Sequence, residues 1–348
     1  MNRDPLHWLR DKFWISIVRS KSNKLFCLAL CALLFALCSS AQAQQPGKLY
    51  RIGYLTMRSD ESERHRVAAF QEGLRELGYT EGKNIVIELR RAAPGQRERL
   101  RELAAELVRL KVDVIVVSGG GLVQVAKETT TTIPIVFTVH ADPVGDGVVA
   151  SLARPGGQVT GLSDLHSVLV GKRIELLKEV VPSASRIAVL SNVAWLTHSH
   201  QLKDIEAVTP AFNMTVLSLP VTGPDDIDRA FTAMRKARAG GLLVLGDPLL
   251  ANHRRQIVNL AAKGRLPSIF TTRESVEAGG LMSYGANLSE LWRRAATYVD
   301  RIFKGAKPAD LPVEQPTKFE LVINVKTAKQ IGLTIPPNVL ARADKVVK

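Results

Sequence analysis

Arg51-Ile52-Gly53-Tyr54-Leu55 and Arg186-Ile187-Ala188-Val189-Leu190 decide the fold, because each opens a series of four short apolar segments. The two series run in the same order, at offsets of about 130 residues. Four matches in order predict that the chain folds into two similar lobes. The first series continues with Asn84–Leu89, Asp113–Val117 and Pro134–Phe137, and the second with Asn213–Leu217, Gly241–Leu245 and Pro267–Phe270.

Amphipathic segments separate the apolar ones. Arg64–Leu77 and Arg97–Leu110 carry apolar residues at spacings of three and four, the period of a helix with one buried face. In the second half we expect helices at Leu196–Thr209, Asp225–Ala237 and His253–Lys263. Apolar strands that alternate with helices are typical of parallel sheets covered on both faces. The predicted fold class is therefore α/β, with two Rossmann-like lobes built on parallel sheets.

The chain is expected to cross between the lobes several times. Short strands at Gln158–Leu162 and Gly280–Tyr284 lead out of the lobes, a helix follows at Leu288–Lys304, and a last strand at Phe319–Asn324. Such a set of linkers can act as a hinge, in which a few residues absorb a closing motion. The predicted lobes are residues 49–162 with 284–315, and residues 163–283 with 316–348.

Residues 1–43 have the pattern of an export signal. A basic segment precedes the uncharged run Leu25–Leu37, which is shorter than the roughly 20 residues that span a bilayer. Ala41-Gln42-Ala43 then fits the small-x-small cleavage pattern. The chain's three cysteines all lie in this segment, so residues 44–348 contain no thiol. We expect a cleaved signal peptide and a periplasmic protein; a membrane anchor is the alternative.

The chain carries a net charge of +14, which raises the question of nucleic-acid binding. The charges are scattered, however, and the densest basic stretch, Arg90–Arg101, has no aromatic residue for base stacking. We interpret this stretch as a solvated helix face and expect no nucleic-acid partner.

Three stretches of the sequence together carry a resemblance to a known protein family. They are Phe70–Tyr79 (FQEGLRELGY), Leu152–Leu162 (LARPGGQVTGL) and Glu277–Gly285 (EAGGLMSYG). With them the chain resembles the ABC-transporter substrate-binding proteins, a family that includes tryptophan- and aromatic-amino-acid-binding members. The resemblance implies the type I periplasmic-binding-protein fold, a small-molecule ligand between the lobes, no catalysis, and an ABC permease in the inner membrane as partner.

The ligand site is expected where the two lobes face each other, because ligands of open α/β sheets bind beyond the carboxyl ends of the strands. His140 is interpreted either as a ligand contact or as a solvated loop residue. Tyr284 and Trp195 are interpreted either as rings that stack on the ligand or as ordinary packing. The candidate ligand-binding residues are Thr56, Ser59, Ser118, Gly119, Gly120, Thr138, His140, Asn192, Asp247, Thr271 and Tyr284.

Two of these segments predict a specific chemistry. Gly119 and Gly120 precede a helix expected near Leu122, where backbone amides and the helix dipole would hold an α-carboxylate; a turn that needs glycine is the alternative. Asp247 ends a buried strand and is interpreted either as a partner for an α-ammonium group or as the N-cap of a helix after Pro248.

The sequence contains no nucleophile elbow, no P-loop and no H-E-x-x-H motif, and no third ligand accompanies His198 and His200. We therefore expect no catalytic residue, no metal and no cofactor. The predicted function is a monomeric solute-binding component of an ABC importer, which captures an amino acid or a related carboxylate by hinge closure. An exported enzyme, or a sensory ligand-binding protein on the same scaffold, is the alternative.

Overall fold

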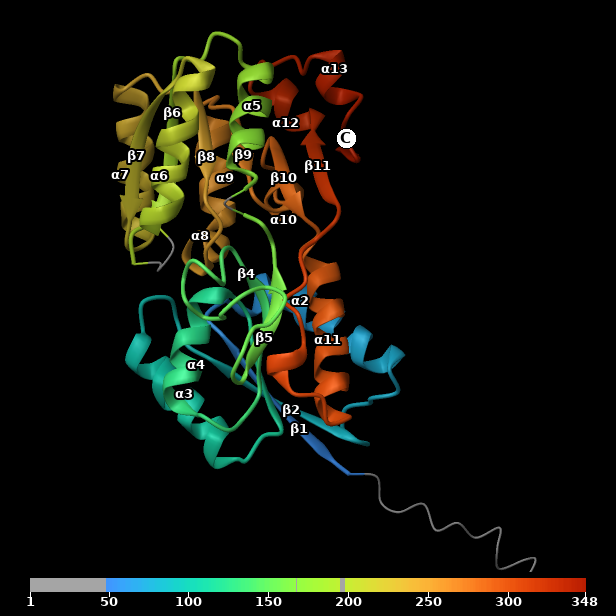
Figure 1. The fold of residues 1–348 in the computed structure, drawn as a ribbon. Coiled ribbons are helices and arrows are strands. Elements are labelled where there is room, and N and C mark those ends of the chain that lie inside the picture. The colour runs from blue at the N-terminus through green and yellow to red at the C-terminus, as the bar shows by residue number, and fades with distance from the viewer. Residues whose placement is uncertain (1–47, 167, 195–197) are drawn as a thin grey trace, which may run out of the picture. The chain divides into compact units, whose positions relative to one another are not determined.

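Two β-sheets organise the chain from Leu49 to Lys348, which forms one compact unit (Figure 1). The computed structural model describes residues 48–166, 168–194 and 198–348, so the expected signal peptide lies outside the described residues. The first sheet is entirely parallel, with the strand order β2-β1-β3-β4-β5. Its strands are β1 (Tyr50–Thr56), β2 (Ile85–Arg91), β3 (Val114–Val117), β4 (Ile135–His140) and β5 (Val159–Ser163).

The second sheet repeats the first and extends it. Its order is β12-β11-β10-β9-β8-β6-β7, so that β7-β6-β8-β9-β10 matches the order of the first sheet. The repeat confirms the prediction of two similar α/β lobes. The added strand β11 runs antiparallel to β10, so this sheet is mixed rather than purely parallel. The strands are β6 (Arg186–Asn192), β7 (Thr215–Val221), β8 (Gly241–Val244), β9 (Ser268–Phe270), β10 (Met282–Ala286), β11 (Phe319–Asn324) and β12 (Lys345–Val347).

The central strands are apolar throughout because both of their faces are buried. In β3, Val114 and Val116 pack into one core cluster, while Ile115 and Val117 pack into another on the opposite face. The strands of the second lobe divide in the same way between two further clusters. Alternate side chains of a strand point to opposite faces of its sheet, so helices on both faces require apolar residues at every position.

Helices cover both sheets. Those of the first lobe are α2 (Asp60–Glu76), α3 (Arg97–Arg109), the 3-10 turn η1 (Gly120–Leu122), α4 (Val123–Thr129) and α11 (Leu288–Phe303). Those of the second lobe are α5 (Val170–Val180), α6 (His198–Val208), η2 (Thr209–Phe212), α7 (Pro224–Lys236), α8 (Pro248–Asn252), α9 (Arg254–Lys263), α10 (Arg273–Glu277), α12 (Val325–Gln330) and α13 (Pro337–Leu340). A further 3-10 turn is η3 (Pro308–Asp310). Among the described helices, none combines the length and hydropathy that a membrane crossing requires.

Helix α2 begins four residues before the predicted helix, and the reason is local. Ser59 is its N-cap, with a side-chain oxygen that accepts a hydrogen bond from the backbone nitrogen of Ser62. Asp60, Glu61 and Glu63 occupy the first turn, where negative charge is favourable against the helix dipole. The predicted start at Arg64 followed the first apolar repeat and overlooked this polar turn.

The chain crosses between the lobes more than once, as the sequence predicts. After β10 it returns to the first lobe as α11, which packs on α2 and β4 (Figure 1). It then runs beside β5, where the amide of Ser163 donates to the carbonyl of Glu314 at 2.8 Å, and re-enters the second sheet as β11. The boundary predicted between residues 283 and 284 falls inside β10. The exact lobe boundaries otherwise stay a prediction.

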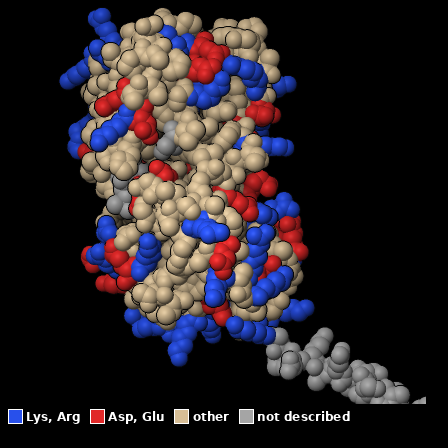
Figure 2. All heavy atoms as spheres, viewed as in Figure 1, with Lys and Arg blue, Asp and Glu red and all other residues tan. Residues whose placement is uncertain are grey.

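The basic stretch from Arg90 to Arg101 lies partly on α3 and is paired with acidic side chains. Arg101 contacts Glu98 and Glu128, and Arg99 contacts Glu102. Figure 2 shows basic and acidic side chains interspersed over the visible face. The predicted solvated helix face is present from Arg97 onwards, as a network of surface ion pairs, whereas Arg90 and Arg91 belong to the end of β2.

Candidate functional site

The carboxyl ends of the strands in both lobes meet at a cavity of about 60 Å³, here called the central cavity. The first lobe contributes Arg58, Gly119, Gly120, Gly121, Val139, His140, Ala141 and Leu288. The second lobe and the connection after β5 contribute Asp164, His166, Arg173, Gln201, Gly246, Asp247, Thr271 and Thr272. Polar and charged side chains predominate in this lining.

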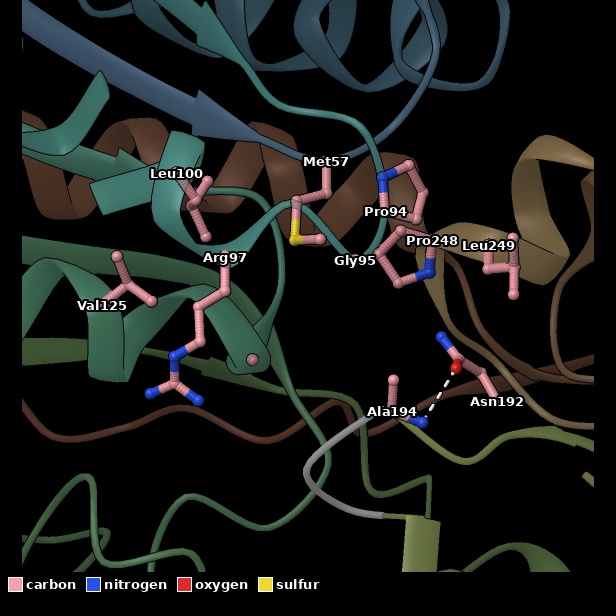
Figure 3. Close-up of a pocket in the computed structure, with 11 residues that line it drawn as sticks. Met57, Pro94, Gly95, Arg97, Leu100, Val125, Asn192, Ala194, Pro248 and Leu249 are labelled. Atoms are coloured by element: carbon pink, nitrogen blue, oxygen red, sulfur yellow. Dashed lines mark hydrogen bonds between the residues drawn. The ribbon is translucent and has the colours of Figure 1, made fainter. Parts of the chain in front are cut away.

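A second, larger cavity of about 240 Å³, here called the side cavity, adjoins the first (Figure 3). Gly121 lines both cavities. Met57 of the side cavity directly precedes Arg58 of the central cavity, and Pro248 of the side cavity directly follows Asp247 of the central cavity. Its lining comes from both lobes and is mostly apolar: Met57, Pro94, Gly95, Arg97, Leu100, Gly121 and Val125 from the first, and Asn192, Ala194, Pro248 and Leu249 from the second.

Asp247 fills the N-cap role, one of the two that the sequence left open, and keeps one carboxylate oxygen unpaired among the described residues. Its Oδ1 caps α8, accepting hydrogen bonds from the amides of Leu249 at 2.7 Å and Leu250 at 3.2 Å, and Asn192 donates to the same oxygen at 3.3 Å. Its Oδ2 is buried and has no hydrogen-bond partner in the described part of the chain. Burial raises the pKa of this carboxyl group to about 6. Oδ2 therefore keeps a capacity to accept a hydrogen bond that no described residue uses.

Arg58 supplies the opposite charge from the first lobe. Its side chain is buried, its Nε has no hydrogen-bond partner among the described residues, and this nitrogen lies 3.7 Å from Glu63 Oε2, with which Arg58 forms an ion pair. Burial lowers the pKa of Arg58 to about 10, which still leaves the guanidinium charged at neutral pH. The cavity thus places a cation of one lobe near an anion of the other.

A chain of buried hydrogen bonds positions the partner of Arg58. Trp292 Nε1 donates to the hydroxyl of Tyr54 at 2.7 Å, and that hydroxyl donates to Glu63 Oε1 at 2.5 Å. Burial raises the pKa of Tyr54 well above its ordinary value, so the phenol keeps its proton. Trp292 belongs to α11, so the segment that returns from the second lobe braces the cation of the first.

Two buried histidines complete the polar lining. Burial lowers the pKa of His140 to about 4 and the pKa of His166 well below its ordinary value, so both imidazoles are neutral at pH 7. His140 Nδ1 and His166 Nε2 have no hydrogen-bond partners among the residues described. His140 lies flat against Gly120, where an added Cβ would come within 2.4 Å of its ring. These rings offer hydrogen bonds to a ligand without adding net charge.

Arg173 and Asp164 form a second pair of opposite charges in the central cavity. Arg173 donates from Nε to the carbonyl of Tyr284 at 2.8 Å and from Nη1 to the carbonyl of His166 at 3.0 Å. Burial lowers the pKa of Arg173 to about 10 and raises the pKa of Asp164. Arg173 therefore ties the connection after β5 to β10, and its charge offsets that of Asp164.

The predicted site residues fall into three groups in the structure. The central cavity brings together five of them, and the side cavity contains a sixth: these are Gly119, Gly120, His140, Asp247 and Thr271, with Asn192 in the side cavity. Thr56 at the end of β1, Ser118 directly after β3 and Thr138 inside β4 are fully buried and line neither cavity. Ser59 contacts the other lobe instead. Trp195 lies outside the described residues.

Tyr284 lies away from both cavities. It sits in the middle of β10, opposite Leu321 of β11, and its ring packs against the second-lobe core and near Phe319, with 6.2 Å between ring centroids. The strand pattern is consistent with this packing role. Met282 and Tyr284 lie two residues apart and so share one face of β10, and Met282 belongs to the same core cluster. The structure thus shows the packing role that the sequence left as one alternative.

The helix predicted after the glycines begins differently from the expectation. A 3-10 turn occupies Gly120–Leu122, and the α-helix that follows, Val123–Thr129, has only seven residues. Gly119 has a φ of 121°, which only glycine adopts readily, so the alternative of a turn that requires glycine applies at this position. The cavity therefore obtains its positive charge from side chains rather than from the dipole of a long helix.

Asn252 at the end of α8 joins the lobes directly. Its Oδ1 accepts hydrogen bonds from the amide of Ser59 and from the hydroxyl of Ser62, both at 2.8 Å, and its Nδ2 donates to the carbonyl of Met57 at 3.4 Å. A buried ion pair between Arg66 Nη2 and Glu274 Oε1, 3.7 Å apart, crosses the same boundary. These contacts hold the two walls of the cavities together.

Known proteins with a similar sequence and fold identify the family. A family model described as ABC transporter substrate binding protein matches residues 51–347. The chain belongs to this family. It is therefore a substrate-binding protein of an ABC transporter, and the family is one of ligand-binding transport proteins rather than of enzymes. In the part of the chain that the structure describes, no three histidine, cysteine, aspartate or glutamate residues form a group able to hold a metal ion.

Three relatives of this substrate-binding protein are informative. The tyrosine-binding protein of Clostridioides difficile (strain R20291) is 27% identical over 264 residues, which cover 76% of this chain and 75% of the relative. A structure from Streptococcus pneumoniae in complex with L-Trp is 27% identical, covers 86% of this chain and 100% of that one, and has a TM-score of 0.80. A ligand-free, open substrate-binding protein from Clostridium difficile is 25% identical, with coverages of 86% and 99% and a TM-score of 0.63.

The TM-score is higher for the structure with bound L-Trp, at 0.80, than for the open structure, at 0.63, which agrees with the direct contacts between the lobes of this chain. This substrate-binding protein is more similar to the ligand-bound structure than to the open one, and Asn252 and the pair of Arg66 with Glu274 join its lobes. A joined arrangement is the one in which residues of both lobes can contact a ligand at the same time.

Proposed function

We propose that this chain is the periplasmic solute-binding component of an ABC importer and that its ligand is an amino acid. The observation that carries the proposal is the pair of opposite charges that line the central cavity, Arg58 from the first lobe and Asp247 from the second; Arg58 Nε and Asp247 Oδ2 have no hydrogen-bond partner among the described residues. An α-amino acid carries a carboxylate and an ammonium group on one carbon, so one small head group matches both charges.

The head group fits the cavity chemically. The carboxylate would contact the guanidinium of Arg58, and charge-assisted hydrogen bonds of this kind are about twice as strong as neutral ones. The ammonium would donate to Asp247 Oδ2, and the neutral imidazoles of His140 and His166 would accept or donate further hydrogen bonds. A sugar carries no charge and would leave Asp247 Oδ2 without the cationic donor that an ammonium group supplies, which is unfavourable in a desolvated site.

The same pair of residues explains how a ligand would close the hinge. Arg58 and Asp247 belong to different lobes, so a ligand bound to both favours the state in which the lobes meet. The connections between the lobes, including the one after β5, would absorb the motion. A permease in the inner membrane would then recognise the closed form of a monomer.

Two of the relatives support the choice of an amino acid. One is named a tyrosine-binding protein and another was solved with L-Trp, although each is only 27% identical to this chain. The export signal predicted at residues 1–43 supports the periplasmic location. We expect N-terminal sequencing of the exported protein to begin at Gln44.

Isothermal titration calorimetry of the exported protein tests the ligand class. The protein is first unfolded and refolded, so that no ligand acquired during growth occupies the site. It is then titrated with the protein amino acids, with their decarboxylated amines, with their deaminated acids, and with a panel of sugars. We expect binding of at least one amino acid and no binding of its amine or acid counterparts. Binding of a sugar, or equal binding of an amine, would refute the zwitterion site.

A further inference from the structure

A surface groove on the second lobe has a basic rim over an apolar floor. It lies between α7 and α9, holds about 590 Å³, and is here called the basic groove. The exposed residues Arg235, Arg238 and Lys263 line it. The lining also contains Asp228, whose Oδ2 accepts a hydrogen bond from Gln256 Nε2 at 3.0 Å. The apolar residues of the lining are Phe231, Met234, Ala239, Leu260 and Leu266.

The topology places the basic groove at the end of the second lobe that faces away from the central cavity. Helix α7 leads into β8 and α9 leads into β9, and these two strands are parallel neighbours. Both helices therefore end at the edge of the sheet where the strands begin, whereas the central cavity lies at the carboxyl ends of the strands (Figure 1). A role for the basic groove is thus separate from ligand binding between the lobes.

Further exposed basic residues lie at the same edge of the sheet. Arg186 begins β6, Lys236 ends α7, and Arg265 follows α9. Within the part of the chain that the structure describes, neither these residues nor the three basic residues of the groove form an ion pair. The basic stretch of the first lobe differs, because Arg99 and Arg101 pair with glutamates. The end of the second lobe therefore carries a positive charge that no described acidic side chain neutralises.

Local structure explains only part of this charge. Basic residues in the last turn of a helix are favourable against the helix dipole, which accounts for Lys236 of α7 and Lys263 of α9. Arg238 and Arg265 lie beyond the last turns, with φ angles of 51° and 48°. Glycine adopts this left-handed conformation more readily than arginine does. The backbone therefore gives no reason for arginine at either position.

We propose that the basic groove and the exposed basic residues around it bind anionic phospholipid head groups, so that the second lobe attaches weakly to the membrane that holds the permease. The proposal goes beyond amino-acid binding and rests only on the proposed location of the protein outside the inner membrane. Basic clusters attract anionic lipids, and each basic residue near the surface strengthens the attachment on the order of fivefold. Such attachment confines the protein to the surface on which it meets its transporter.

The side chains of the groove favour a lipid surface over a single free anion. A site for one small anion needs donors that converge and are held in place. Here the Arg235 guanidinium donates to the Thr232 hydroxyl at 3.4 Å, and no described residue forms a hydrogen bond or ion pair with the side chain of Arg238 or Lys263. Long exposed side chains of this kind can each reach a different phosphate of a bilayer. The apolar floor offers contacts to the glycerol and to the first methylene groups of a lipid.

Co-sedimentation with vesicles tests the proposal. The exported protein is mixed with vesicles of phosphatidylcholine alone, and with vesicles of phosphatidylcholine and phosphatidylglycerol in equal parts. We expect binding to the mixed vesicles at low salt, release at high salt because salt screens the attraction, and little binding to phosphatidylcholine alone. A triple variant with Arg235→Gln, Arg238→Gln and Lys263→Gln should bind the mixed vesicles about a hundredfold more weakly, from about fivefold for each residue. All three positions are exposed, so the variant is expected to fold, and a thermal melt checks this.

A second triple variant is the matched control. Arg99→Gln, Arg101→Gln and Arg293→Gln lower the net charge by the same amount, at first-lobe positions that pair with glutamates. The control should bind the mixed vesicles nearly as well as the wild type does. Neither set of substitutions touches the lining of the central or the side cavity, so both variants should bind the best amino acid with the wild-type affinity.

Several results would overturn the proposal. The wild type could fail to bind the mixed vesicles, or both triple variants could lose binding equally, which would assign the attraction to net charge alone. Inorganic phosphate could displace the protein from the vesicles at constant ionic strength, which would make free phosphate the ligand. The wild type could bind polyglutamate but not the vesicles, which would make an acidic protein the partner. Amino-acid binding is measured separately, so none of these results affects the proposed amino-acid site.

Discussion

Replacing Asp247 with asparagine should stabilise the unliganded protein and at the same time weaken ligand binding. The carboxyl group is buried, and burial raises its pKa from an ordinary value of 3.8 to about 6. A raised pKa means that the folded protein holds the proton more tightly than the unfolded chain does. The ionised carboxylate therefore lowers the free energy of unfolding at pH 7, and this cost decreases as the pH falls from 6 towards 4.

The size of the effect follows from the shift. About two pKa units at about 1.4 kcal/mol each give a cost of about 3 kcal/mol at pH 7. Asparagine is as good an N-cap as aspartate, so Asp247→Asn should keep the cap of α8 and remove the charge. The unliganded variant should melt on the order of 5 °C higher than the wild type at pH 7. Asp247→Ala also loses the cap, which costs about 1 kcal/mol, and should gain less.

The assay is a pair of measurements on the refolded protein at pH 7. Calorimetric melting gives the stability of the unliganded form, and titration with the best amino acid gives the affinity. We expect Asp247→Asn to weaken the affinity at least a hundredfold, because the ammonium group loses a buried anionic partner. A variant that melts lower than the wild type and still binds with unchanged affinity would show that Asp247 is only a structural cap and that the reasoning is wrong.

The remaining predictions concern pH, closure and the glycine turn. Between pH 7 and pH 5 the wild-type affinity should fall about tenfold, because one pH unit below a pKa of about 6 only about a tenth of Asp247 is ionised; Asp247→Asn should show no such fall in titrations across this range. Asn252→Ala removes three hydrogen bonds between the lobes, so X-ray scattering should show a larger unliganded particle, and the affinity should fall about tenfold. Gly120→Ala places a Cβ against the His140 ring and should lower the free energy of unfolding by about 1 to 3 kcal/mol in denaturant titrations, whereas Gly171→Ala, which meets nothing within 4 Å, should not.

Much of the fold could be predicted from the sequence because its determinants are local. The apolar runs at Val114–Val117 and Leu242–Val244 reflect strands buried on both faces, and that burial leaves no polar position to interrupt the pattern. Short helices such as α8 and α10, with five residues each, have no such periodicity. Their positions depend on caps and on packing against the rest of the lobe, which a one-dimensional pattern does not contain.

The candidate site also contains residues that the sequence predicted and residues that it did not. The rule that ligands bind at the carboxyl ends of strands located His140, Asp247 and Thr271 in the central cavity. It did not find Arg173 and Gln201, which reach the cavity from helices rather than from strand ends. Arg173 follows β5 by ten residues, and only the path of the connection between the lobes brings it back to the cavity. Such residues become candidates once the topology is known.

The two alternatives for Asp247 that the sequence left open are compatible, and their combination has a consequence for binding. Oδ1 is fixed by two backbone amides and by Asn192, so the carboxylate cannot rotate freely. Oδ2 is held in a fixed position beside the central cavity, which Asp247 lines, and has no partner among the described residues. A group that is held in its binding orientation before the ligand arrives loses little conformational entropy on binding. The helix cap thus orients the proposed ammonium anchor, and the unfavourable burial of its charge in the unliganded protein is the free energy that an ammonium group would recover.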